Sequence, residues 1–266
     1  MSIKSIIKFV FTNVLLFGLS ALHFMILTQY NFLIRMISFI LRNALLVKFM
    51  DYILSIYRKK NNINEYTVPV ESYKYEFKIN LLRTSILEFI DYEVINILFP
   101  FALFNWIEIL YFIVVSFLYE VIFDFFHYWT HRLAHSIPFI YKKSHKLHHK
   151  NIALIPIITF VQEPFDLILT NMFPIAMTLT ILNVLKIKFS LFIYVCIMTY
   201  KSYVEIAGHA PIIKTKSCAF PQCIWLPKML GIELYSKNHN KHHAYPNTNF
   251  SKRFSLWDKV FGTWID

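Results

Sequence analysis

Residues 124–149 read DFFHYWTHRLAHSIPFIYKKSHKLHH and contain six of the chain's eleven histidines. At about 100° per residue on a helix, His127 and His131 lie about 40° apart, and the three histidines of HKLHH at 145–149 fit within about 100°. Each group therefore points in one direction from its helix. The HxxHH spacing recurs in KNHNKHH at 237–243, with His209 between the second and third groups, so nine histidines follow one repeated pattern.

This pattern favours a shared metal site. Imidazole is a common metal ligand, and although a single HxxxH pair is more simply explained as a surface accident, three groups at helical spacing are not. A structural zinc site would normally include cysteine, and nine imidazoles are too many for one tetrahedral ion. Two ions with five or six ligands each would be satisfied by nine imidazoles, a carboxylate or water, and dioxygen.

The composition indicates a membrane protein. Hydrophobic residues make up 56% of the 266 positions and charged residues only 16%, which lies outside the range of soluble domains. The net charge of +11 could suggest nucleic-acid binding, but the basic residues flank the hydrophobic segments, where they orient a membrane protein. The three cysteines form no CxxC motif and are expected to be reduced thiols.

Several segments are long and apolar enough to cross a bilayer. Residues 6–30 are expected to be an uncleaved anchor, because the apolar run exceeds that of a signal peptide. Residues 32–57 carry more charge and would either span or lie along the interface. Residues 81–123 would form a helical hairpin or one tilted span, with Pro100 and Glu108 as possible break points. Residues 165–185 and 189–207 are predicted to form a second hairpin.

The polar stretch at 58–80 is the best candidate for a cytosolic linker and a boundary. It would divide the chain into N-terminal membrane anchor segments at 1–80 and a catalytic membrane domain at 81–266. Histidine groups that share one metal site must lie on one side of the membrane, and the second hairpin supplies the even number of crossings this requires. The basic flanks of the histidine groups place that side in the cytosol. The sequon Asn249-Phe250-Ser251 should therefore carry no glycan.

Residues 119–264 resemble the fatty acid hydroxylase and sterol desaturase superfamily of membrane di-iron enzymes, and are most similar to its sterol 4-methyl oxidase and sterol desaturase branches. The resemblance rests on HYWTHRLAH at 127–135, YKKSHKLHH at 141–149, Glu163-Pro164, Gly208-His209, KNHNKHH at 237–243 and SLWDKVFGTW at 255–264. It implies an all-α integral membrane protein of about four transmembrane helices with a cytosolic, histidine-rich helical cap.

The resemblance also implies two iron ions, with zinc as a possible artefact of overexpression. Dioxygen would be the oxidant, with electrons from NAD(P)H through a reductase and a separate haem-type donor protein. One histidine stands at 209 where some relatives have a closely spaced pair, so a tenth ligand is not identified. The iron ligands, and so the catalytic residues, would be His127, His131, His145, His148, His149, His209, His239, His242 and His243.

Residues near the ligands are candidates for supporting roles. Carboxylates that accept hydrogen bonds from ligand rings orient and tune a metal site. The candidates are Asp124, Glu163, Glu205 and Asp258. His135, four residues after His131, could be a spare ligand but is better explained as a supporting or solvated residue. His23 lies far from the groups and is expected to be packed or interfacial.

The predicted function is a di-iron oxidoreductase of the endoplasmic reticulum membrane that hydroxylates or desaturates a sterol or long-chain fatty acyl lipid. Cleavage of an unactivated C–H bond requires a cofactor that activates oxygen, which this metal site would provide beside a lipid phase. The alternative is a non-catalytic metal-binding or metal-transporting membrane protein. Transport would place histidines along the spans, whereas these flank them.

Overall fold

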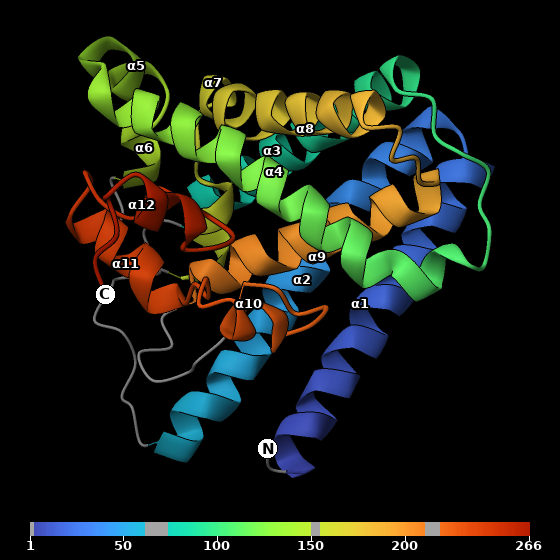
Figure 1. The fold of residues 1–266 in the computed structure, drawn as a ribbon, viewed down its shortest axis with the longest axis horizontal. Coiled ribbons are helices and arrows are strands. Elements are labelled where there is room, and N and C mark those ends of the chain that lie inside the picture. Colours follow the sequence, from blue (N-terminus) through green and yellow to red (C-terminus); the bar gives the residue numbers. More distant parts are fainter. Residues whose placement is uncertain (1–2, 62–73, 150–154, 211–218) are drawn as a thin grey trace.

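The computed structural model describes residues 3–61, 74–149, 155–210 and 219–266, and within these ranges every regular element is a helix (Figure 1). Element η1 is a 3₁₀ helix and η2 is a π-helical turn between two α-helices. In chain order the elements are α1 (Ile3–Gln29), α2 (Phe32–Asn61), α3 (Lys74–Leu98), α4 (Glu108–Ser136), α5 (Pro138–Lys143), α6 (Lys146–His149), η1 (Pro156–Phe160), α7 (Pro164–Leu167), η2 (Ile168–Met172), α8 (Phe173–Val184), α9 (Leu191–Gly208), α10 (Leu226–Met229), α11 (Ser236–Ala244) and α12 (Leu256–Val260).

Three helical segments among the described residues are long and apolar enough to cross a membrane: Ile6–Gln29, Glu108–Ser136 and Pro164–Val184. Their outward faces carry exposed side chains such as Leu110, which is 84% exposed, as lipid-facing helices require. Helix α9 is less apolar, because it carries Lys201 and Glu205. It follows α8 as the second leg of the predicted hairpin but packs along α1, whereas α8 packs along α4. The prediction of an all-α integral membrane protein is confirmed, and about four spans are consistent with it.

The membrane helices pack in pairs, α1 along α9, α2 along α3 and α4 along α8. One apolar core joins all six, with Leu16, Leu46, Phe89 and Ile193 at most 2% exposed. Lipid tails are as apolar as these side chains, so close packing and polar contacts, rather than removal from water, must hold the helices together. Arg42 Nη2 on α2 lies 2.8 Å from Glu88 Oε2 on α3, an example of such a contact.

The predicted polar linker at 58–80 is wrong at both ends. Helix α2 continues to Asn61 and α3 already begins at Lys74. The charged residues at the start of α3 misled the prediction, because Phe77 among them is 7% exposed and packs with Ile158 and Val161. The middle of the stretch lies outside the described residues. The division at residue 80 stays a prediction, although α1 and α2 share the core of the later helices.

Residues 81–123 form the hairpin rather than one long span. Helix α3 ends at Leu98, just before Pro100, and α4 begins at Glu108. Glu108 Oε1 accepts a hydrogen bond from the backbone N–H of Ser190 at 3.2 Å, and Ala102 forms an isolated bridge with Ser190. The α3–α4 and α8–α9 connections therefore meet at one end of the bundle. Figure 1 shows the C-terminal part of α4 with α5, α6, α11 and α12 at the opposite end.

Candidate metal centre

Helix α4 presents three histidines in a row toward the loops at its C-terminal end. His127, His131 and His135 are spaced by four residues, so each is rotated only about 40° from the last. The ring centroids lie 5.1 Å apart from His127 to His131 and again from His131 to His135. The row meets α6 and α11, which bring the two HxxHH motifs, and His209 joins them from the C-terminal end of α9.

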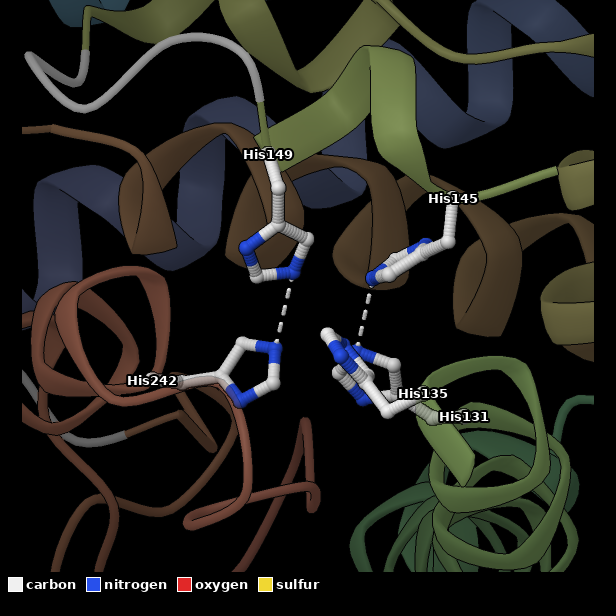
Figure 2. A group of neighbouring side chains, drawn as sticks. All are labelled: His131, His135, His145, His149 and His242. Atoms are coloured by element: carbon white, nitrogen blue, oxygen red, sulfur yellow. Dashed lines mark hydrogen bonds between the residues drawn. The ribbon is translucent and has the colours of Figure 1, made fainter. Parts of the chain in front are cut away.

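The first histidine group converges from three parts of the chain (Figure 2). Its potential ligand nitrogens all lie within 4.8 Å of one another. Nε2 of His131 is 2.9 Å from Nε2 of His145, and Nε2 of His149 is 3.1 Å from Nε2 of His242. The members are His131, His135, His145, His149 and His242.

The second histidine group consists of His148, His209, His239 and His243, again with nitrogens within 4.8 Å of one another. His209 is central to it, because its Nε2 lies 3.2 Å from Nε2 of His148 and 3.1 Å from Nε2 of His239. Each HxxHH motif is thus divided between the two groups. Adjacent histidines such as His148 and His149 point to different groups, which explains the paired HH in both motifs.

The hydrogen bonds of the outer ring nitrogens fix the tautomers. His131 Nδ1 donates to the carbonyl oxygen of Phe250 at 2.7 Å, and His145 Nδ1 donates to the carboxylate of Asp166 at 2.9 Å. In the neutral rings Nε2 then carries no hydrogen. The two Nε2 lone pairs, 2.9 Å apart, therefore repel one another, and a cation shared between them would stabilise the arrangement. The donor set fits a metal ion.

The same reasoning holds in the second group and around His242. His209 Nδ1 donates to the carbonyl oxygen of Glu205 at 2.8 Å, and His242 Nδ1 donates to that of Thr248 at 2.7 Å. Burial lowers the pKa of His209 and of His242 to about 4, so both rings are neutral at pH 7. Burial, followed by the neighbouring His242, lowers the pKa of His149 to about 2. Neutral imidazoles are the form that binds metals.

His135 belongs to the first group, although the sequence suggested only a supporting role. Its Nε2 is buried and has no hydrogen-bond partner among the described residues. The ring centroid lies 4.7 Å from that of His149 and 4.8 Å from that of His145. His135 therefore has both the position and the unpartnered nitrogen that a metal ligand requires.

His127 lies outside both groups, although the sequence singled it out. Its Nδ1 donates to the carbonyl oxygen of Thr170 at 2.7 Å, and its ring stacks on Phe123 with centroids 5.9 Å apart. The HxxxH spacing occurs twice on α4, at 127–131 and at 131–135, and sequence alone could not choose between the two registers.

Asp166 is the supporting carboxylate that sequence reasoning missed. It is 1% exposed and accepts a hydrogen bond from His145 Nδ1 at both oxygens, at 2.9 and 3.0 Å. A signal was present, because Asp166 is the only acidic residue in the otherwise apolar run at 165–185. A carboxylate is costly in such a run and therefore implies a partner.

The four predicted carboxylates have different positions. Asp124 is fully buried, and its oxygens accept the backbone N–H groups of Lys252, Arg253 and Phe254 at 2.7–3.0 Å. It therefore holds the loop whose Phe250 carbonyl orients His131.

Asp258 supports the same loop from its other side, by accepting the N–H groups of Phe250 at 2.8 Å and Ser251 at 2.9 Å. Glu205 reaches His209 through its backbone carbonyl, while its carboxylate pairs with Lys201 and Arg253. Glu163 is 40% exposed and lies 4.0 Å from Arg83, with no hydrogen bond to a histidine ring among the described residues.

A pocket opens between the two histidine groups and contains about 390 Å³ of space not filled by protein atoms. His131 and His145 from the first group and His148, His209 and His239 from the second contribute to its walls. The remaining wall includes His127, Thr170, Phe250 and Lys252. A small part of a larger molecule placed here would face both groups at once.

Comparison with protein families gives one match. The model of the fatty acid hydroxylase family matches residues 116–263, more than half of the chain. The matched region contains every member of both histidine groups and Asp166. No solved structure matches the chain at a significant level.

Characterised relatives are similar over the same region. The chain is 29% identical over 156 residues to the fatty acid hydroxylase vlmA of Lecanicillium sp, covering 56% of this chain and 41% of that protein. It is 27% identical to the Delta(7)-sterol 5(6)-desaturase erg3B of Aspergillus fumigatus, covering 62% and 41%. It is 28% identical to the methylsterol monooxygenase erg25A of the same fungus, covering 57% and 46%. The matched region thus spans less than half the length of each relative.

Proposed function

The chain belongs to the fatty acid hydroxylase family, and from this premise we propose that it is a di-iron lipid oxidoreductase that uses dioxygen to hydroxylate or desaturate a sterol or a long-chain fatty acyl group. The observation that carries the proposal is the pair of facing histidine groups, in which the Nδ1 hydrogen bonds of His131, His145, His209 and His242 leave Nε2 without a hydrogen. The relatives named above are a hydroxylase, a desaturase and a monooxygenase, all of them oxidoreductases acting on lipids by name.

We assign five ligands to one iron and four to the other. His131, His135, His145, His149 and His242 would hold the first, and His148, His209, His239 and His243 the second. Two iron ions would supply the oxygen activation that cleavage of an unactivated C–H bond requires and that no side chain provides. This assignment places His135, rather than His127, in the ligand set.

The chain's own residues would orient the ligands and the substrate. Asp166 holds the His145 ring and offsets part of the positive charge left by neutral ligands. The Phe250 carbonyl, fixed by Asp258, sets the tautomer of His131. The pocket between the groups is the proposed place for the reacting carbon, with Phe250 and Thr170 in its wall. Its position at the end of the membrane helices suits a substrate that enters from the lipid phase.

The electrons must come from another protein. We propose a separate haem-type donor protein that is reduced from NAD(P)H by its reductase. In a eukaryotic cell we place the chain in the endoplasmic reticulum membrane with the histidine end in the cytosol. The many basic residues around the histidine motifs support this orientation.

The test is lipid profiling of host cells that express the parent chain or His148→Ala. His148 is 8% exposed in a four-residue helix outside the candidate spans, so its loss should remove a ligand without disturbing membrane insertion. We expect an oxidised sterol or acyl product with the parent only, and about two iron ions per purified parent chain. The matched control is Lys146→Ala, an exposed change in the same helix, which should retain the product. Equal product from His148→Ala and the parent would refute the function.

A further inference from the structure

A second cavity lies within the membrane helices, away from the pocket between the histidine groups. Its walls come from α1, α2, α3, α8, α9 and the π-helical turn η2, and it contains about 440 Å³ of space not filled by protein atoms. None of the nine proposed metal ligands contributes to it.

His23 is the polar side chain of this cavity that has no partner. It is 3% exposed, and neither Nδ1 nor Nε2 has a hydrogen bond to any residue that the structure describes. Its ring packs edge-on against Phe39, with centroids 4.7 Å apart. A buried imidazole with two unsatisfied nitrogens is costly, and a charged one would be more so, so the ring is neutral and suited to a ligand.

Three of the four charged residues in the cavity wall are paired, and the fourth, Asp91, is a buried carboxylate without an ion pair among the described residues. Arg42 Nη2 lies 2.8 Å from Glu88 Oε2, and Lys201 Nζ lies 2.7 Å from Glu205 Oε1. Lys201 also donates a hydrogen bond to the side chain of Asn171, the residue of η2 that lines the cavity. An anionic ligand would have to break one of these pairs, whereas a neutral hydroxyl would not. A hydroxyl both donates and accepts, so it satisfies either tautomer of a neutral imidazole.

We propose that this cavity binds the hydroxyl group of a membrane lipid alcohol, with His23 as the recognising residue. Leu27, Phe39 and Ile175 form an apolar part of the wall that suits the adjoining hydrocarbon. Two of the segments that line the cavity, Ile6–Gln29 and Pro164–Val184, are long and apolar enough to cross a membrane, where lipids are the abundant solutes. A sterol and a straight-chain alcohol share this chemistry, and the experiment separates them.

The experiment is photolabelling of the purified chain in phosphatidylcholine nanodiscs. One arm uses a diazirine analogue of cholesterol and the other a diazirine analogue of 1-octadecanol, and the labelled peptides are identified by mass spectrometry. We expect labelling of α1, α2 or α9 in at least one arm, and competition by the unlabelled alcohol about 3–10 times better than by the hydrocarbon that lacks its oxygen, the difference expected from one hydrogen bond. The arm that labels identifies the class of lipid.

His23→Phe keeps the ring and its contact with Phe39 while removing both nitrogens. We expect labelling to fall about 3–10-fold. The matched control is Ser20→Ala on α1, since Ser20 is buried like His23, donates to the helix carbonyl of Leu16 and lies outside the cavity wall. His148→Ala should label like the parent.

Three results would overturn the proposal: no labelling in either arm, equal competition by the alcohols and by the hydrocarbons that lack the oxygen, or better competition by stearic acid than by octadecanol. Undiminished labelling of a folded His23→Phe protein would do the same. If that variant does not fold, the competition series on the parent chain still decides. Labelling requires no turnover, so this test and the test of the proposed function can fail independently.

Discussion

His127 and His135 show that spacing alone does not identify which histidine of a motif joins the metal-binding group. Both lie four residues from His131 on α4, but the Nε2 of His135 is a buried, unpartnered nitrogen within the first histidine group, whereas His127 is outside both groups. The difference arises from the end of the helix. Beyond His135 the chain turns at Ile137, so α5 and α6 fold back over that end and bring His145 and His149 to it.

We expect His135→Ala to lower the iron content from about two toward one per chain. Product formation should fall at least as much as the 10–100-fold typical of losing a residue that supports a ligand. His127→Ala should retain both ions, because its Nδ1 bond to Thr170 holds only its own ring. Metal analysis and turnover of both purified variants provide the measurement. Loss of iron from His127→Ala but not from His135→Ala would restore the register first expected from the sequence.

Asp166 supports a ligand by charge as well as by position. In Asp166→Asn the amide oxygen can still accept from His145 Nδ1, but the negative charge is lost, so we expect turnover to fall about 10–100-fold with the fold intact. Asp166→Ala should lower turnover further, because it also removes the acceptor that orients the His145 ring. Glu163→Gln is the comparison variant, since Glu163 is 40% exposed, pairs with Arg83 and has no hydrogen bond to a histidine ring among the described residues. Steady-state turnover and iron content of the three proteins would be compared. Unchanged turnover in Asp166→Asn would show that the charge is irrelevant.

At the scale of elements, Asp124 on α4 fixes the segment that follows α11. One carboxylate accepts the N–H groups of three successive residues, 252–254, and thereby positions the preceding Phe250 carbonyl against His131. Helix α4 thus holds both a ligand and the loop that orients it. The site is built between elements that are more than a hundred residues apart in the chain.

Asp124→Ala should leave those three N–H groups without an acceptor. At about 1–3 kcal/mol for each unsatisfied buried group, the free energy of unfolding should fall by several kcal/mol. The control is Asp266→Ala, because Asp266 is 76% exposed and a solvent-exposed ion pair such as its pair with Lys237 contributes little to stability. Thermal unfolding in detergent and limited proteolysis after residue 244 would measure the effect. Equal melting temperatures of the two variants would mean that other contacts hold the segment at 252–254.

At the scale of the whole molecule, the apolar runs predicted the spans well because a bilayer imposes their length on the sequence. The hairpin at 165–207 and the anchor at 6–30 correspond to α7–α8, α9 and α1. The local sequence pattern did not predict the features that depend on tertiary packing. Phe77 draws the start of α3 into the core although its neighbours are charged, and His135 gains its place only through the fold of α5 and α6. The division of each HxxHH motif between two groups likewise depends on where α6, α9 and α11 meet.

The proposed orientation in the membrane rests on the basic residues at the two ends of the bundle. Lys142 and Lys143 lie in α5 at the histidine end, whereas Lys186 and Lys188 lie in the α8–α9 turn at the other end. The basic excess favours a cytosolic histidine end, although the two lysines of the turn count mildly against it.

The sequon at Asn249 is a poor reporter of membrane orientation. Asn249 is 1% exposed and donates to the carbonyl oxygens of Asn238 and Ile265, so a glycan there would be incompatible with the fold on either side.

Cysteines at the two ends report orientation directly, since Lys142 and Lys188 are both exposed. In sealed microsomes with their cytosolic face outward, a membrane-impermeant maleimide should label Lys142→Cys without detergent. It should label Lys188→Cys only after detergent is added, because the turn between α8 and α9 would face the lumen. The parent chain, which has native Cys218 and Cys223, supplies the background for subtraction. The reverse pattern would place the histidine groups in the lumen, where a cytosolic electron donor could not reach them.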